Sequence, residues 1–219
     1  MTNVQDDYLI DSNNELKPLI ITFGGINGGI YQPLFEFKNF LQKYINCHFM
    51  FIRDTKQCWY HGGIIGFGKN INQVKLNIIK IIQTINYSKI ITIGGSMGGY
   101  ASLLFGQLIN ADGIIAFSPQ TFIDQTNRKL YNDNRWSNQI NSIYNKFDDT
   151  YYDLLKLNFD KSKVNIIYGN NDKLDKIHCE RFLTKNNIKI NSYSGGHNIV
   201  KYLRDSGILI KIINKFIID

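Results

Sequence analysis

Residues 89–109, KIITIGGSMGGYASLLFGQLI, decide how this chain folds. The opening KIITI (residues 89–93) is a short apolar run of the kind that forms a buried strand. The closing YASLLFGQLI (residues 100–109) has helical character, and the glycine-rich GGSMGG (residues 94–99) between them fits a tight turn. The stretch is therefore predicted to be a strand, a tight turn and a helix.

The same alternation extends along the chain in both directions. Helical patterns lie between short apolar runs, and strands that alternate with helices form βαβ units with right-handed crossovers. We therefore expect an α/β fold with a mostly parallel central sheet and helices on both faces. The expected strands are residues 18–23, 48–52, 89–93, 111–117, 164–168 and 188–193, and the expected helices are residues 32–44 with Pro33 in the first turn, 70–85, 100–109 and 174–185, followed by a final amphipathic stretch.

The length and composition fit one domain. With 219 residues, of which 43% are hydrophobic, the chain has enough apolar material to bury a sheet between helices. We expect residues 1–219 to form a single domain. Residues 119–160, between the strands at 111–117 and 164–168, carry no strand pattern. Such a long excursion in a compact domain is usually functional, so a lid-like insertion is predicted there.

Charge and cysteine content narrow the choice of partners. The net charge of +7 comes from basic residues spread along the chain, which argues against a nucleic-acid-binding surface. Cys47, Cys58 and Cys179 have no metal-binding spacing, so neither a metal site nor a disulfide scaffold is expected. We expect a cytoplasmic protein, because no leader-peptide pattern and no membrane-spanning apolar stretch occur. The oligomeric state stays open.

Ser96 is the candidate nucleophile. It stands in Gly-Gly-Ser-Met-Gly (residues 94–98), a G-x-S-x-G pattern placed between a predicted strand and a predicted helix. In this setting the serine occupies a strained turn, and the flanking glycines avoid clashes and let its hydroxyl project into a site. The alternative is a plain glycine turn in which Ser96 caps the following helix.

A serine nucleophile needs a base, and the base needs an orienting acid. His197 follows one late strand in the sequence Ser-Gly-Gly-His, and Asp172 follows the strand before it. Because the carboxyl ends of parallel strands meet at one edge of a sheet, both side chains are expected near Ser96. Loop spacing favours Asp172 as the acid, with Asp175 as the second choice. The alternative for His197 is a surface loop histidine.

The oxyanion formed during attack on a carbonyl needs backbone N–H donors. The Met97 amide, directly after the nucleophile, is expected to be one of them. Gly25 or Ile26, in the loop after the first central strand, is expected to supply the second. A phosphate-binding role for this loop is disfavoured, because G-G-x-x-G-G is not the dinucleotide-binding pattern and lacks the P-loop ending.

Four stretches carry a resemblance to a known family. GGSMGG (residues 94–99), GNND (residues 169–172) and GGHN (residues 195–198), in this order of elements, resemble the α/β-hydrolase superfamily over most of the chain. Residues 96–122 also resemble small hydrolase-like proteins linked to polysaccharide loci and glycan modification. The resemblance implies a compact α/β-hydrolase fold. Its sheet should be trimmed, because only about seventeen residues precede the first central strand.

Aromatic residues near the expected site are candidates for substrate binding. Trp59, Tyr60 and His61 follow a strand end, where they are placed to contact a sugar or an acyl chain. The alternative is that Trp59 and Tyr60 simply cover the core. In the insertion, Arg128, Arg135 and Trp136 are interpreted as part of a solvated lid surface rather than as contacts to an anionic or sugar-like substrate.

Three functions are open at this point. The preferred one is a serine hydrolase, a carboxylesterase or acyl esterase that forms an acyl-enzyme on Ser96, with an acylated carbohydrate as the substrate that the resemblance implies. The second is an acyltransferase that uses the same triad to acylate a glycan. The third is a non-catalytic binding module with a hydrolase fold. No metal or cofactor is expected, and the expected partner is a small-molecule or carbohydrate ester.

Overall fold

A seven-stranded sheet organises the computed structural model, which describes residues 6–26 and 35–218. Six neighbouring strands are parallel, and the edge strand β1 runs antiparallel to its neighbour β3. The strand order is β1 (Tyr8–Asp11), β3 (His48–Ile52), β2 (Lys17–Phe23), β4 (Tyr87–Gly95), β5 (Gly113–Phe117), β6 (Lys163–Gly169) and β7 (Ile188–Tyr193). The predicted mostly parallel sheet is confirmed.

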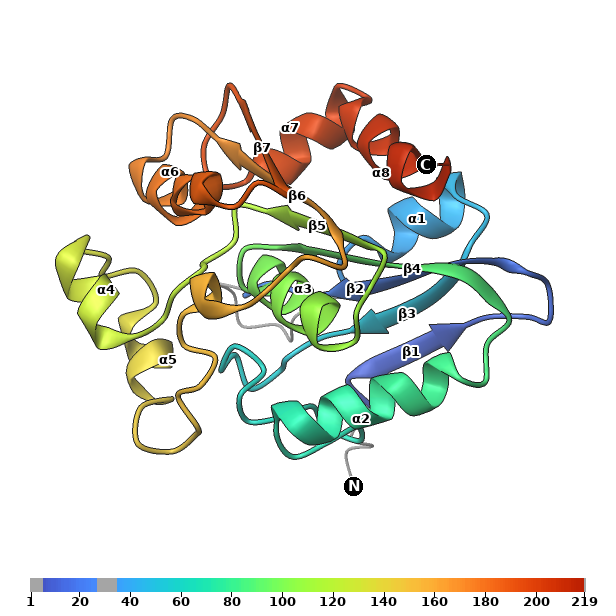
Figure 1. Cartoon of the computed structure of the whole chain (residues 1–219), viewed down its shortest axis with the longest axis horizontal. Helices are drawn as coiled ribbons and strands as arrows, with labels where there is room; N and C mark the ends of the chain where they lie inside the picture. Colours follow the sequence, from blue (N-terminus) through green and yellow to red (C-terminus); the bar gives the residue numbers. More distant parts are fainter. Residues whose placement is uncertain (1–5, 27–34, 219) are drawn as a thin grey trace.

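Helices cover both faces of the sheet (Figure 1). One face carries α2 (Ile71–Ile82), α3 (Met97–Leu108) and α6 (Lys173–Glu180), and the other carries α1 (Lys38–Tyr44), α7 (Ile199–Asp205) and α8 (Ile208–Ile218). Each layer buries its own apolar cluster against the sheet. Within residues 6–26 and 35–218, no helix has the length and apolar character needed to cross a bilayer.

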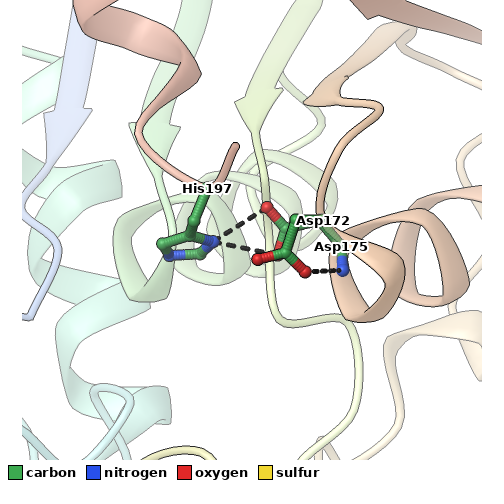
Figure 2. Close-up of side chains that lie close together, drawn as sticks. All are labelled: Asp172, Asp175 and His197. Carbon is green, nitrogen blue, oxygen red and sulfur yellow. Dashed lines mark hydrogen bonds and ion pairs between the residues drawn. The ribbon is translucent and has the colours of Figure 1, made fainter. Parts of the chain in front are cut away.

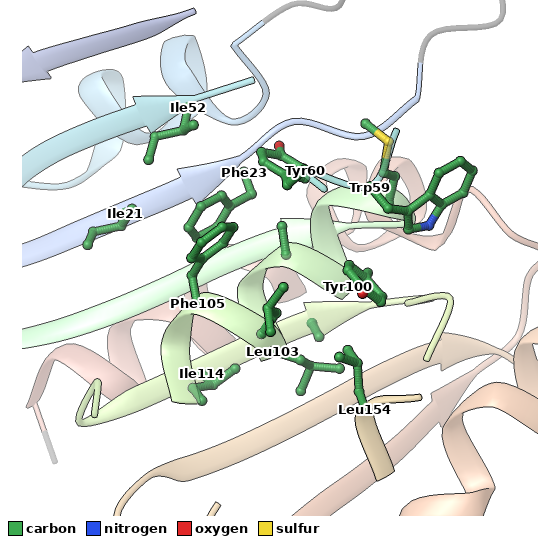
Figure 3. Packing of buried hydrophobic residues seen from close by; sticks show 14 of the residues in the cluster. Ile21, Phe23, Ile52, Trp59, Tyr60, Tyr100, Leu103, Phe105, Ile114 and Leu154 are labelled. Atoms are coloured by element: carbon green, nitrogen blue, oxygen red, sulfur yellow. The ribbon is translucent and has the colours of Figure 1, made fainter. Parts of the chain in front are cut away.

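The inner strands are rich in apolar residues because both of their faces are covered. All five residues of β3 and all five of β5 are buried, and apart from His48 none of them is polar. On the face shown in Figure 3, Phe23 of β2 stacks on Phe105 of α3 with ring centroids 5.3 Å apart. This packing fixes α3, and therefore the turn that precedes it, against the middle of the sheet.

Three details differ from the sequence prediction. The strand β1 was missed, because it has only four residues and half of them are exposed. The helix expected at residues 32–44 is described only from Lys38, since Phe37 has a left-handed φ of 65° that a helix does not accept. Pro33, expected in the first turn of that helix, lies outside the described residues. The helix expected at 70–85 ends at Ile82.

Residues 118–162 form an insertion between β5 and β6. They contain α4 (Gln125–Leu130), α5 (Ser137–Asn141) and the short 3-10 helix η1 (Leu154–Lys156), at the left of Figure 1. Ile123, Ile140 and Leu154 are fully buried and belong to the same apolar cluster as α3. The insertion therefore packs onto the domain through its own apolar side chains.

Candidate active site

Ser96 occupies the turn between β4 and α3, as predicted. Its φ of 54° and ψ of −120° are costly for any residue other than glycine. A Cβ atom on Gly98 would lie 2.1 Å from the carbonyl oxygen of Phe23, and one on Gly94 would lie 2.0 Å from that of Gly98. Only glycine fits at these two positions, because the backbone of Gly98 packs against that of β2 and the backbone of Gly94 packs against that of Gly98. The alternative reading is wrong, since α3 receives no capping hydrogen bond from the Ser96 side chain.

A chain of hydrogen bonds joins Ser96, His197 and Asp175. The Ser96 hydroxyl lies 2.9 Å from Nε2 of His197, and Nδ1 of His197 lies 2.9 Å and 2.8 Å from the two carboxylate oxygens of Asp175 (Figure 2). Nδ1 donates to the carboxylate, so Nε2 is free to accept the serine proton. The Asp175 side chain is only 1% exposed, whereas that of His197 is 31% exposed. The arrangement places a buried acid behind an accessible base.

The preferred acid of the sequence prediction is not the residue that contacts His197. Asp172 caps α6 instead, and its Oδ1 accepts hydrogen bonds of 3.0 Å from the backbone N–H groups of Leu174 and Asp175. Figure 2 shows the bond from Asp175. Asp175, the second choice, lies in the first turn of α6 and points toward His197. The preference for Asp172, which rested on loop spacing, was wrong because Asp172 is the N-cap of α6 and its carboxylate binds the first N–H groups of that helix.

The same three side chains are close enough to hold a cation. The candidate ligand atoms of Asp172, Asp175 and His197 lie within 4.8 Å of one another. Each has a partner within the protein, however, because Asp172 caps α6 and Asp175 binds both His197 and the guanidinium of Arg135. We therefore assign none of them as a metal ligand.

Asp175 is held in its charged form. Burial by itself raises the pKa of this carboxyl, but the hydrogen bond and charge of His197, followed by those of Arg135, lower the pKa below its ordinary value. Nη1 of Arg135 lies 2.8 Å from Oδ1 of Asp175. An ionised Asp175 can stabilise the imidazolium that forms when His197 takes a proton.

A cavity of about 640 Å³ opens over Ser96 and His197. Its walls are largely aromatic and aliphatic, and basic side chains lie along one part of its lining. The apolar lining residues include Phe35, Phe37, Phe40, Phe117, Trp136 and Leu209, and the basic ones are Lys38, Lys201 and Arg204. The cavity is large enough for a small-molecule substrate.

The predicted oxyanion donors lie at or beside this cavity. Met97 begins α3, where the first N–H groups of a helix lack intrahelical partners, and both Gly25 and Ile26 line the cavity. Sequence reasoning missed Glu36, whose carboxyl lies against the Gly25 amide. Burial raises the pKa of Glu36 to about 7, although the hydrogen bond from Gly25 acts in the opposite direction. An acid that titrates near neutrality therefore faces the candidate oxyanion site.

Gln120 is a second residue that sequence reasoning missed. Its side-chain Nε2 donates a hydrogen bond of 3.0 Å to Oγ of Ser96, and the residue is 2% exposed. A signal for it existed in the sequence, because Gln120 follows β5 and the carboxyl end of β5 lies beside that of β4. The Ser96 hydroxyl thus has two side-chain partners, His197 and Gln120.

The aromatic residues predicted to bind substrate do not line the cavity. Trp59 and Tyr60 are fully buried and His61 is 3% exposed. The Tyr60 hydroxyl donates to the carbonyl oxygen of Gly24 at 2.8 Å, and Nε2 of His61 pairs with the Tyr100 hydroxyl at 2.8 Å. The substrate-binding prediction for these residues is wrong, because their loop turns inward and covers the core, as the alternative held (Figure 3).

The interpretation of the insertion as a solvated surface is also wrong for three of its residues. Arg128 is 8% exposed and bonds the carbonyl oxygen of Arg135 at 2.9 Å. Arg135 reaches the carboxylate of Asp175, and Trp136 lines the cavity. No spacing rule in the sequence predicts the contact between Arg135 and Asp175, which are 40 positions apart.

Comparisons with known proteins were made by sequence and by structure. No model of a known protein family matches the chain, and neither does the sequence of any curated protein. Among solved structures, the capsule O-acetyltransferase of Neisseria meningitidis serogroup A is 22% identical, with a TM-score of 0.69, and 93% of this chain and 90% of that chain are covered. The same enzyme in complex with CoA is 21% identical, with a TM-score of 0.66 and coverage of 93% and 90%.

A serine hydrolase gives a further match. The fluorophosphonate-binding serine hydrolase F of Staphylococcus aureus is 16% identical, with a TM-score of 0.60, and 95% of this chain and 86% of that chain are covered. Identities this low establish similarity of fold, and the similarity spans almost the whole chain. With its mostly parallel sheet and its turn between β4 and α3, this chain has the α/β-hydrolase fold.

Proposed function

We propose that this protein is a serine hydrolase that cleaves esters through an acyl-enzyme on Ser96. The hydrogen-bonded series Ser96, His197 and Asp175 is the observation that carries the proposal. Such a series turns a weak hydroxyl nucleophile into a reactive one, because the base removes its proton as the bond to the carbonyl forms. The buried Asp175 holds the imidazole in the required tautomer.

The proposed reaction has two halves. In the first, Ser96 Oγ attacks the ester carbonyl while His197 Nε2 takes the hydroxyl proton, and the amides of Met97 and Ile26 stabilise the oxyanion. Gly25, the other predicted donor, already gives its amide hydrogen bond to Glu36. The intermediate then collapses as His197 protonates the departing alcohol. In the second half, His197 deprotonates a water molecule, which attacks the acyl-enzyme and releases the acid.

Acyl transfer to a sugar hydroxyl is the second candidate. It shares the acyl-enzyme and differs only in the group that attacks it, and one structural match is a capsule O-acetyltransferase also solved with CoA. The basic side chains in the cavity lining suit the phosphate groups of a CoA thioester. Release of free CoA from acetyl-CoA, measured with and without a saccharide acceptor, separates transfer from hydrolysis. Release that requires the acceptor favours transfer, and acceptor-independent turnover favours hydrolysis.

The test of the shared chemistry is turnover of short and long p-nitrophenyl esters together with labelling by a fluorophosphonate. Ser96→Ala is expected to abolish the label and to lower kcat at least about 10³-fold, because the nucleophile is removed. Ser118→Ala is the matched control, since this serine is also buried at a strand end and its Oγ has no partner among the described residues. Labelling of the control together with loss of label in Ser96→Ala supports the proposal.

A folded wild-type protein that does not turn over esters or acetyl-CoA and does not react with the fluorophosphonate would favour the third function, a non-catalytic binding module. Labelling that persists in Ser96→Ala would place the nucleophile elsewhere and would contradict the proposal.

A further inference from the structure

A buried ionic cluster connects the proposed triad to the insertion. Nη1 of Arg135 binds Oδ1 of Asp175 at 2.8 Å. Nε and Nη2 of Arg135 bind the two oxygens of a second acid, Asp133, both at 3.1 Å. The Arg135 side chain is 21% exposed, whereas those of both acids are 1% exposed. One cation therefore bridges two buried acids.

Asp133, the second acid of the cluster, is bound to α6, the helix that carries Asp175. Oδ2 of Asp133 accepts a hydrogen bond of 2.9 Å from Nε2 of His178, which lies on α6 together with Asp175. Nδ1 of His178 accepts from the backbone N–H of Thr121 at 2.9 Å, so its ring is neutral. Burial lowers the pKa of His178 and keeps it in this form. Arg135 is thus the positive charge that compensates both acids.

We infer that Arg135 is a positioning residue of the proposed triad, which fixes the Asp175 carboxylate against His197 and opposes protonation of the imidazole. The inference rests on the proposed function of that triad. Two features of the guanidinium support it. Because Nε and Nη2 are both bonded to Asp133, Nη1 is presented to the Asp175 carboxylate from a fixed direction. The positive charge also partly offsets that of the carboxylate that binds His197, which disfavours the imidazolium.

Other charged groups also face His197 and bear on its titration. Asp172 lies beside it on α6, and the cavity that His197 lines is also lined by Glu36, Lys38, Lys201 and Arg204. Arg135 differs from these residues because it alone, among the described basic side chains, bonds the carboxylate that binds His197. Glu36 titrates near pH 7, so activity against pH does not by itself isolate His197. The titration of the His197 ring must be observed directly.

The experiment follows the ring resonances of His197 against pH by NMR, together with kcat and KM for an ester, in wild type, Arg135→Met and Arg135→Lys. Without the cation, Arg135→Met is expected to move the His197 titration to higher pH and to lower kcat about 10- to 100-fold. Arg135→Lys keeps the charge and loses the fork. Its His197 titration should stay close to wild type, while kcat falls severalfold.

The matched control is Arg181→Met. Arg181 also ties the insertion to the domain through a two-pronged ion pair, with Nη1 and Nη2 at 2.7 Å and 3.1 Å from the carboxylate of Asp153. It has no bond to the triad, so its loss should leave the His197 titration unchanged. If Arg135→Met and Arg181→Met alter kcat equally and neither moves the titration, Arg135 has only a structural role and the inference fails.

Two further variants, Trp136→Ala and Arg135→Lys, separate a positioning role of Arg135 from effects on substrate binding and on folding. Trp136 follows Arg135 and lines the cavity, so Trp136→Ala is expected to change KM and to leave the His197 titration in place. If Arg135→Met does not fold because two buried acids lose their cation, Arg135→Lys still tests the fork. A wild-type kcat in folded Arg135→Lys would overturn the positioning role. Because the NMR titration needs no turnover, it tests the contact even if Ser96→Ala shows that the proposed function is wrong.

Discussion

The turn at residues 94–99 and the insertion at residues 118–162 both reach the same site, but different physics holds them there. The turn packs backbone against backbone, with room for glycine only at Gly94 and Gly98. The insertion reaches the site through long side chains, such as that of Arg135, which bind acids far away in the sequence. Close backbone contact restricts the local sequence, whereas a long side chain can arrive from many positions. The first kind of contact therefore leaves a readable motif, and the second does not.

The pKa values of buried carboxyl groups shift in opposite directions beside the two regions. Beside the turn, burial raises the pKa of Glu36 to about 7, and a backbone amide offsets this only in part. Beside the insertion, burial also acts to raise the pKa of Asp175 and Asp133, but their bonds to histidine and to Arg135 lower it below the ordinary value. Hydrogen bonds from histidine, followed by the contacts of Arg135, thus reverse the direction of the pKa shift at these two acids.

The largest expected effect tests which carboxylate at the start of α6, that of Asp172 or that of Asp175, serves the proposed triad. Asp175→Asn is expected to lower kcat roughly 10²- to 10⁴-fold, because it removes the charge and the acceptor that orient His197. Asp172→Asn is the matched control. Asparagine caps a helix about as well as aspartate, so its activity should stay near wild type. Ester turnover measures both, and the reverse ranking would return the role to Asp172.

The second test concerns the backbone packing of the turn. Gly98→Ala is expected to lower the free energy of unfolding by about 3 kcal/mol or more, because the new Cβ would meet the carbonyl oxygen of Phe23 at 2.1 Å. Gly207→Ala isolates the cost of conformation, since Gly207 has a φ of 69° with no atom near its added Cβ, and about 1 kcal/mol is expected. Urea unfolding compares the two. Equal losses would show that close packing is not what the turn requires.

The third test uses the acid beside the turn. Since the pKa of Glu36 is raised from 4.5 to about 7, the folded protein retains a proton that the unfolded chain releases, and stability falls as pH rises through this window. Glu36→Gln removes that loss, so it should unfold at a higher temperature than wild type at pH 8 and match it at pH 4. The gain is at most about 3 kcal/mol. A stability difference that does not change with pH would contradict the assigned cause.

Much of the fold was predictable from local sequence. The predicted strands at 48–52 and 188–193 match β3 and β7 residue for residue. β3 is marked by its apolar run, and β7, an edge strand of mixed apolar and polar residues, is marked by its place between a helical pattern and a glycine loop. The edge strand β1 escaped notice, since it pairs on one side only and lacks an unbroken apolar run. Its identity as a strand depends on β3, which lies about forty residues away.

Within the candidate site, the sequence by itself determined the turn at Ser96 and the position of His197 after a late strand. Both follow from local backbone geometry and from the order of the strands. Tertiary structure alone decided that Asp175 rather than Asp172 meets His197, and that Trp59 turns inward. It also brought Gln120 to Ser96 and Arg135 to the acid. These contacts depend on the directions in which side chains of separate elements point, and a local sequence pattern does not determine those directions.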